Sequence, residues 1–263
     1  MSRICPLFSG SSGNSTYIAS ESGSLLIDVG VSFRAVTAAL NAVGGSPEEI
    51  SAVLITHEHT DHIKGLKTLL KHIKVPVLAS ETTLNTLVDL DIIPPETKVL
   101  SLDEGNEAEL CGFGITRFPT LHDCAGSSGY SVRTVDSRKI SVCTDLGRVT
   151  DSVRSAISGS DVILIESNHD IDMLKKGPYP PALKMRILSD NGHISNNACA
   201  AELPNLLKNG TERFILGHLS RKNNSPLLAF NCAQAALVDC GAKDGVDYIL
   251  SVAAPTGNGV TVV

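Results

Sequence analysis

The sequence predicts a layered α/β fold formed by one domain over residues 1–263. Short runs of β-branched and other apolar residues alternate with segments in which apolar residues recur at helical spacing. The chain has 263 residues, a length that one α/β domain can reach, and 42% of them are hydrophobic. No repeat, low-complexity tract or Pro/Gly-rich linker divides it. These observations favour a single ordered domain with a large buried core.

The predicted strands are runs rich in Val, Ile and Leu that end at small or polar residues. They cover residues 4–8, 25–28, 52–56, 113–119, 140–144, 162–166, 213–216 and 248–252. Several of them are followed directly by turns rich in Gly, Ser, Thr, Asp or His. Because ligands of open α/β sheets bind beyond the strand ends, a functional site is expected at these turns.

The predicted helices lie between the strands. Apolar residues three and four positions apart define one helix around residues 33–43 and a second over residues 61–73. Residues 195–207 and 226–240 are two further helical segments, and Ser195 is placed to cap the first of these.

Charge and composition limit the classes of function. Lys and Arg total 22 against 28 Asp and Glu, so the net charge is −6 at pH 7. This balance excludes a generally basic protein that wraps nucleic acid, but it permits a local basic groove. Trp is absent and aromatic residues make up only 4% of the chain, so base stacking and sequence specificity should be small.

The sequence favours a cytoplasmic protein with no membrane segment. The N-terminal residues become polar within the first nine positions, and no run approaches the roughly 18 apolar residues that a membrane span needs. The seven cysteines are widely spaced and form no C-x-x-C pair. Reduced, mostly buried thiols are therefore expected.

The strongest functional signal is the segment THEHTDH at residues 56–62, which follows a predicted strand. Residues two apart in an extended segment face the same way, so His57 and His59 should point together. Asp61 and His62 follow at a predicted helix start, which turns them toward a neighbouring point. Imidazole and carboxylate groups suit a divalent ion such as zinc, manganese or iron. A chance occurrence is rare, roughly 0.0005 per chain of this length.

Turns after other predicted strands supply further ligand types. His122, Asp145 and His218 lie in such turns, and Asp28, at the end of another strand, could orient a ligand. Each of them alone could be an ordinary structural residue. Together with the 56–62 segment, the first three complete a set of five His and two carboxylates, which is sufficient for two metal ions.

With this set of residues, the chain resembles the metallo-β-lactamase-fold hydrolases over nearly its whole length. Other segments resemble the WalJ/YycJ branch, which is known for 5′→3′ exonuclease-type phosphodiesterase activity on DNA. These segments are SGSSGN at 9–14, ESNHD at 166–170, GHISN at 192–196 and HLSRKNN at 218–224. The resemblance implies a four-layer αββα sandwich. Only 72 residues separate Asp145 from His218, which leaves no room for the large inserted domain of the RNA-processing nucleases in this superfamily.

The resemblance also implies a dinuclear metal centre with a bridging water or hydroxide. One ion would be held by His57, His59 and His122, and the other by Asp61, His62 and His218. Asp145 would bridge the two ions, and Asp61 could also orient the nucleophile. Two divalent ions about 3.5–4 Å apart activate a shared water and clamp a phosphoryl oxygen, which agrees with phosphodiester chemistry.

His193 is a second candidate catalytic residue. It directly precedes the predicted helix 195–207, whose N-terminus could accept a phosphate oxygen. We hypothesise that His193 donates a hydrogen bond or a proton to the scissile phosphate or the leaving group. The alternative is a histidine that only completes the capping loop.

Candidate substrate contacts come from two polar loops. Ser11 and Asn14 lie in the loop 9–15, which could line the 5′-phosphate end of a substrate or form a plain turn. Arg221, Asn223 and Asn224 follow His218 and are placed for phosphate contacts. Lysines at positions 64, 67, 71 and 74 form a basic stripe, which is either a solvated helix face or a rail for phosphates.

The sequence thus predicts a hydrolase with two divalent ions, most simply a phosphodiesterase or 5′→3′ exonuclease that acts on DNA ends. The metal ligands alone also permit hydrolysis of a small carbonyl substrate, either a thioester or a lactam. A non-catalytic module that keeps metals for structure is the third alternative. The basic residues beside the ligands favour the phosphodiester. Metal identity, strand preference and oligomeric state are left open.

Overall fold

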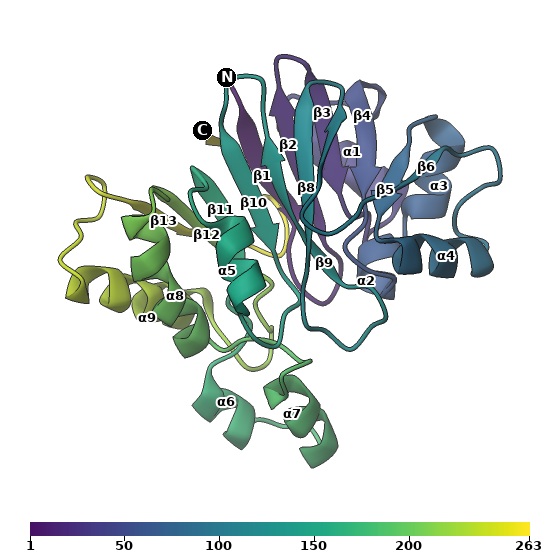
Figure 1. The fold of residues 1–263 in the computed structure, drawn as a ribbon. Helices are drawn as coiled ribbons and strands as arrows, with labels where there is room; N and C mark the ends of the chain where they lie inside the picture. The colour runs from purple at the N-terminus through teal and green to yellow at the C-terminus, as the bar shows by residue number, and fades with distance from the viewer.

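Two β-sheets pack face to face, and helices cover both outer faces (Figure 1). The computed structural model describes all 263 residues. From edge to edge, the first sheet consists of β14 (Thr261–Val262), β1 (Arg3–Phe8), β2 (Ser15–Ser20), β3 (Gly23–Ile27), β4 (Ile50–Leu54), β5 (Val77–Ala79) and β6 (Val99–Ser101). The second consists of β13 (Ile249–Val252), β12 (Arg213–Gly217), β11 (Val162–Glu166), β10 (Lys139–Cys143), β9 (Ser128–Arg133), β8 (Phe113–Pro119) and β7 (Glu107–Leu110). The predicted αββα sandwich is confirmed.

Most helices lie on the two outer faces of the sandwich, and two project from it. The first sheet is accompanied by α1 (Phe33–Ala42), a 3-10 turn at Pro47–Glu49, α2 (Thr60–Ile63), α3 (Leu66–His72) and α4 (Glu81–Asp89). The second is accompanied by α5 (Asp151–Ile157), α8 (Asn196–Lys208) and α9 (Pro226–Asp239). Two short helices, α6 (Ile171–Lys176) and α7 (Pro181–Leu188), project beyond the sandwich. None of the helices combines the length and the apolar character that a membrane crossing requires.

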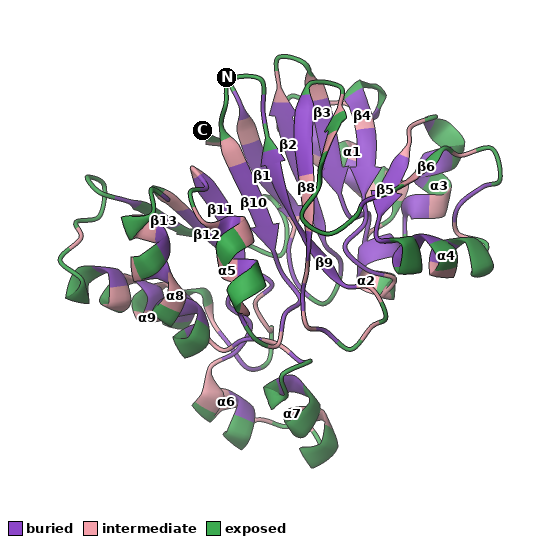
Figure 2. Cartoon of the chain, in the orientation of Figure 1, coloured by how far each residue is buried: buried purple, intermediate pink, exposed green.

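Three clusters of buried apolar side chains hold the four layers together. One lies between the first sheet and its helices, one between the second sheet and its helices, and the third between the two sheets. Strand β11 shows why: Ile163 and Ile165 face the helices, whereas Val162 and Leu164 face the opposite sheet. A strand covered on both faces is apolar throughout, which is the pattern that predicted it. Figure 2 shows this continuous burial along the central strands.

The carboxyl ends of the central strands meet at one edge of the sandwich. Strands β3 and β4 are parallel neighbours in the first sheet, and β10, β11 and β12 are parallel neighbours in the second. The turns after these strands contain the candidate ligands that the sequence identified, at residues 28, 57–62, 145 and 218. The common edge is thus the place at which distant segments of the chain can form one site.

The predicted helix over residues 61–73 is wrong in one respect, because the structure divides it into α2 and α3 at Gly65. The Gly65 N–H donates to the Val29 carbonyl at 2.8 Å, and a Cβ at Gly65 would lie 2.0 Å from the Val31 oxygen. The segment after β3 therefore packs directly on the backbone at Gly65. This tertiary contact interrupts a helix that the apolar spacing alone would continue.

Candidate metal centre

The 56–62 segment forms its cluster through a change of backbone direction. The segment leaves β4 extended, and His57 and His59 present their rings side by side, with ring centroids 4.5 Å apart. His59 is the N-cap of α2, and the helix turn then returns His62 to the same place, with its ring centroid 4.1 Å from that of His57. His57 and His62 are fully buried. The predicted extended-then-helical geometry is present.

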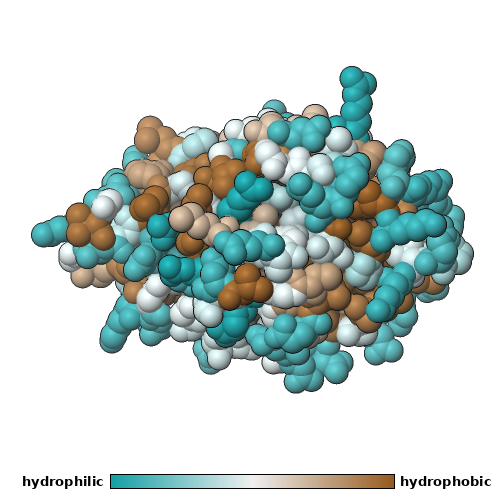
Figure 3. Space-filling view, turned by 90° about the horizontal axis from the view of Figure 1, so that it is seen from above, coloured by the Kyte–Doolittle hydropathy of each residue, from teal (hydrophilic) through white to brown (hydrophobic).

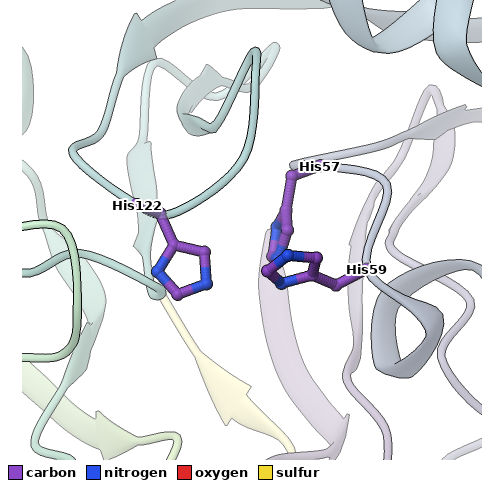
Figure 4. Close-up of side chains that lie close together, drawn as sticks. All are labelled: His57, His59 and His122. Atoms are coloured by element: carbon purple, nitrogen blue, oxygen red, sulfur yellow. The ribbon is translucent and has the colours of Figure 1, made fainter. Parts of the chain in front are cut away.

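A first group of possible ligands combines this segment with the loop after β8. The ring nitrogens of His57, His59 and His122 lie within 4.8 Å of one another. Figure 4 shows the three rings converging from two separate segments. The Nδ1 atom of His122 lies 3.1 Å from the Gly192 carbonyl, so that its Nε2 remains for a metal ion.

A second group combines Asp61, His62 and His218, whose ligand atoms also lie within 4.8 Å of one another. The Nδ1 atom of His62 lies 2.7 Å from Asp28 Oδ2, and the Nδ1 atom of His218 lies 2.7 Å from Glu166 Oε1. A carboxylate behind each ring fixes its orientation and leaves Nε2 for coordination. Asp28 thus takes the orienting position that the sequence indicated.

Asp145 lies between the two groups. One of its carboxylate oxygens is 3.3 Å from His62 Nε2, and the other is 3.3 Å from His218 Nδ1 and 3.9 Å from His122 Nε2. A carboxylate oxygen of Asp145 also lies within 4.8 Å of a ring nitrogen of His57. The side chain is buried and contacts residues of both groups, which is the placement that a bridging carboxylate requires.

The donor atoms fit divalent metal ions. His57 Nε2, His218 Nε2 and Asp145 Oδ2 are buried, yet none of the three has a hydrogen-bond partner. Each unpaired buried polar atom costs about 1–3 kcal/mol, so three at one point need a common partner. Imidazole nitrogens with carboxylate oxygens are a suitable ligand set for zinc, manganese or iron.

The electrostatics of the site follow from buried carboxylates among imidazoles. Burial lowers the pKa of His62, but Asp145 and Asp28 outweigh it and raise that pKa to about 9. Burial likewise lowers the pKa of His218, and Asp145 with Glu166 raises it to about 10. Burial raises the pKa of Asp145, but the surrounding histidines hold it well below its usual value. The carboxylates thus supply negative charge that can balance bound cations.

Three of the site residues have unusual backbone conformations. Asp28, Asp145 and His218 have φ angles of 63°, 55° and 55°, in the left-handed region that residues other than Gly rarely adopt. Asp28 and His218 directly follow the last residue of β3 and of β12, and Asp145 is the second residue after the end of β10. This conformation turns each side chain out of the strand direction and into the site.

Glu166 is the functional residue to which sequence reasoning assigned no role. It is fully buried at the end of β11, and its Oε1 lies 2.8 Å from His193 Nδ1 as well as 2.7 Å from His218 Nδ1. Burial raises its pKa, but His193 and His218 prevail and lower that pKa to about 2. A carboxylate that ends a buried parallel strand was the available signal, the same one that marked Asp28.

His193 lies at the open side of the cluster. Its ring centroid is 5.0 Å from that of His122 and 5.2 Å from that of His218. The side chain is 18% exposed, whereas the side chain of His218 is 3% exposed. Since Glu166 engages Nδ1, Nε2 is the nitrogen free to meet a substrate.

The candidate substrate residues differ in how far the protein already engages them. Ser11 is exposed in the loop before β2, and the Arg221 guanidinium donates to Ser12 in the same loop at 2.8 Å. Asn14 is buried, and its amide nitrogen lies 3.0 Å from His62 Nε2. This loop therefore borders the ligand cluster.

Asn223 and Asn224 are buried instead. The Asn224 amide nitrogen donates to the carbonyls of Ser167 and Asn168 at 2.9 and 3.0 Å, and its oxygen accepts from Asn196 at 2.9 Å. These bonds join the loop after β12 to the loop after β11 and to α8. The Asn224 side chain, which was expected to contact the substrate, is therefore bonded within the protein.

A backbone clasp holds the ligand segment in place, and it provides a testable prediction. Gly30 N–H donates to the Asn14 carbonyl and Asn14 N–H donates to the Asp61 carbonyl, both at 2.8 Å. A Cβ at Gly30 would lie 1.7 Å from the Asp61 oxygen. We expect Gly30→Ala to lower the free energy of unfolding by about 1–3 kcal/mol and to reduce the metal content. Thermal unfolding and elemental analysis measure both effects.

The matched control for that prediction is Gly259→Ala, because nothing lies within 4 Å of the added methyl group there. It should leave both quantities unchanged. Equal behaviour of the two variants would show that the clasp has no part in forming the site.

A wide surface cavity lies away from these ligands, although cavities are ordinarily the first candidates for an active site. Its volume is about 760 Å³, and it lies beside the C-terminal ends of α8 and α9, lined by Pro204, Lys208 and Cys240 among others. It contains none of the clustered ligands. The donor cluster, with its unpaired buried atoms, carries the stronger chemical argument.

Comparisons with known proteins agree with the fold. The family described as beta-lactamase superfamily domain matches residues 24–219. Exodeoxyribonuclease YycJ of Bacillus anthracis is 36% identical over 224 residues, which cover 85% of this chain and 84% of the relative. Exodeoxyribonuclease WalJ of Streptococcus pneumoniae is 34% identical over 251 residues, which cover 92% and 90%.

A solved structure supports the fold alone. The metallo-β-lactamase fold protein YhfI from Bacillus subtilis superimposes with a TM-score of 0.73 at 15% identity, and the match covers 99% of both chains. The family match spans most of the chain, and the two relatives exceed one third identity over most of their length. The chain therefore belongs to the metallo-β-lactamase superfamily of hydrolytic enzymes, in the YycJ/WalJ branch.

Proposed function

We propose that this protein is a metal-dependent phosphodiesterase that removes nucleotides from DNA ends in the 5′→3′ direction. The observation that carries the proposal is the convergence of two groups of ligands on Asp145, with His193 at their open side. The relatives named exodeoxyribonuclease support DNA as the substrate. Hydrolysis of a small thioester or lactam is the alternative that the ligands alone allow.

The proposed centre holds two divalent ions, either zinc, manganese or iron. The proposed ligands are His57, His59 and His122 for one ion and Asp61, His62 and His218 for the other, with Asp145 shared. When bound, such ions supply an activated water as nucleophile and neutralise charge on the phosphoryl group. The remaining chemistry belongs to side chains of the protein.

Asp61 and His193 have distinct proposed roles. The Asp61 carboxylate accepts from the Asn14 amide at 3.4 Å and is partly exposed, so it can orient the attacking water through a hydrogen bond. His193 can donate a proton from Nε2 to the leaving oxygen, because Glu166 holds the ring by Nδ1. Glu166 is a positioning residue in this scheme.

The loop of residues 9–15 and Arg221 are the proposed binding site for the terminal phosphate. Ser11 and Ser12 present hydroxyl groups there, and Arg221, bonded to Ser12, presents a fixed positive charge beside the ligands. For Asn14, Asn223 and Asn224 we propose positioning roles, because each side chain is buried and bonds within the protein.

The test of this function compares three classes of substrate. Protein loaded with manganese or zinc should release nucleotides from 5′-phosphorylated DNA and hydrolyse a bis-ester phosphate chromogen. It should act far more slowly on a thioester and on a lactam. Hydrolysis of a carbonyl substrate without any phosphodiester cleavage would establish the alternative instead.

Metal removal has an expected effect on stability. Ions that bind only the folded chain stabilise it by about 2.7 kcal/mol at a free concentration one hundred times Kd. Adding chelator to the loaded protein should therefore lower the unfolding temperature, and restoring the metal should reverse the change. Calorimetry measures this without any reference to activity. An unchanged unfolding temperature would mean that the cluster does not bind ions tightly.

A further inference from the structure

The helices α6 and α7 form an arm, residues 171–188, whose two ends each lie five residues along the chain from a residue of the candidate site. The chain enters the arm five residues after Glu166 and returns from it to His193. Figure 1 shows the arm projecting below the sandwich, at the edge where the site lies. Most of its side chains are exposed (Figure 2). A projection of this kind extends the surface over which a long substrate can be held.

The arm is attached to the site at several points. His193 N–H donates to the Ile187 carbonyl at 3.0 Å, and the Arg186 guanidinium donates to Asp123, the residue after His122. The Lys184 ammonium donates to the Lys175 carbonyl at 2.7 Å and so joins the two helices. These bonds give the arm a defined position relative to the proposed ligands.

A second contact brings α6 beside the loop that follows His218. Asp170 N–H donates to the Asn223 carbonyl at 2.8 Å, and a Cβ at Gly177 would lie 2.5 Å from Asn223 Oδ1. Asn223 therefore contacts both the N-cap and the C-cap of α6, one with its carbonyl and the other with its side chain. Lys222 on the loop and Lys175 and Lys176 on the helix are thereby placed on neighbouring segments.

We define these three residues, Lys175, Lys176 and Lys222, as the basic strip. All three are exposed, and the one acidic partner is Asp172, 4.0 Å from Lys176 with both side chains more than 70% exposed. Exposed pairs of this kind contribute little, so the charge of the strip is not neutralised. Arg221, the neighbour of Lys222 in the chain, adds a further positive charge, although the net charge of the protein is −6.

We propose that the basic strip binds backbone phosphates of the substrate strand beyond the nucleotide being cleaved. This inference rests on the proposed function. The strand would leave the metal centre past Arg221 and cross Lys222 onto α6, where it meets Lys175 and Lys176. Contacts with phosphates carry no sequence information, so the strip provides affinity and retention of the strand without base preference.

The lysines of α3 are less suited to this role. Lys67 is paired with Asp91 at 2.6 Å, and α3 packs beside β5, away from the arm (Figure 1). Lys71 and Lys74 are exposed like the strip residues. They therefore provide a control with the same change of charge. On the face opposite the arm, seen in Figure 3, hydrophobic areas are broken up by hydrophilic side chains.

The test measures cleavage of a long 5′-phosphorylated single strand and of a dinucleotide by the manganese-loaded protein at several salt concentrations. The double variant K175Q/K176Q should raise KM for the long strand several-fold with kcat maintained. The slope of log(kcat/KM) against log[salt] should fall by roughly 0.7 for each lost phosphate contact. The loss should be confined to the long strand, because a dinucleotide does not reach α6.

The control variant K71Q/K74Q should retain the wild-type KM and salt slope. If K175Q/K176Q matches wild type on the long strand, or if the control loses as much, the strip proposal is wrong while the exonuclease function stands. If the wild-type protein hydrolyses the phosphate chromogen but binds and cleaves no DNA, the proposed function itself is overturned, and a strip specific for an acidic peptide would have to be considered in its place.

Discussion

Replacing Asp145 with Asn should lower kcat/KM for phosphodiester hydrolysis by about 10³-fold or more, which corresponds to about 4 kcal/mol of transition-state stabilisation. Asp145 contacts residues of both ligand groups and provides the negative charge between them. An amide keeps the size of the side chain and tolerates the left-handed backbone at φ 55°, so the fold should persist. The metal content, measured by elemental analysis, should fall with the activity.

Asp89→Asn is the control for this variant, since Asp89 is exposed on α4 and far from the ligands in sequence. It should retain wild-type activity and metal content. Full activity of Asp145→Asn with a full complement of metal would disprove the bridging role. Loss of activity with an unfolded far-UV spectrum would call for Asp145→Glu, which keeps the negative charge and lengthens the side chain by one methylene, assayed for metal content alone.

Replacing His193 with Ala should lower kcat for DNA by about 10²–10⁴-fold, the usual contribution of a general acid. A chromogenic diester with a nitrophenol leaving group does not need protonation, so its hydrolysis should change far less. The comparison of the two leaving groups is the measurement. It separates proton donation from a general disturbance of the site, which would slow both substrates alike.

Glu166→Gln should show the same dependence on leaving group, because Glu166 acts on the chemistry by holding His193 at Nδ1. It also holds His218, so metal content must be measured in parallel. His169→Ala, in the loop that follows β11, is the matched control. The His169 ring is buried, and neither of its nitrogens bonds to any residue of the site. Equal losses on DNA and on the chromogen for His193→Ala would remove the proton-donor role.

Much of the fold could be predicted from the sequence, because its central strands carry their own local signal. The segment VILI of β11 is apolar since both faces are covered, and the predicted segments 25–28, 52–56, 140–144 and 213–216 overlap β3, β4, β10 and β12 for the same reason. Strands β5 and β6, of three residues each, and the short helices α6 and α7 lack such a signal. They are too short to show a clear periodicity, so their structure depends on neighbours that only the folded chain supplies.

The candidate ligands were also predictable, for a local reason. The THEHTDH segment places four donor groups within six residues, and His122, Asp145 and His218 each follow a recognisable strand. Glu166 also lies at the end of a predicted strand, but the sequence does not show which residues it contacts, so no role could be inferred for it. Its pairing with His193 and His218 joins positions 27 and 52 residues apart, which no local pattern encodes.

What the sequence by itself determined is therefore the chemistry of the donors and the strands that carry them, since side-chain type and periodicity are properties of short segments. Only the tertiary structure decided where contacts with distant segments override the local preference of the chain. Gly65 interrupts a helix because the segment after β3 packs on its backbone, and Asn224 bonds inward because two loops and the start of α8 meet around it. Both outcomes come from contacts between distant segments, whose energies outweigh the local preference of the residues involved.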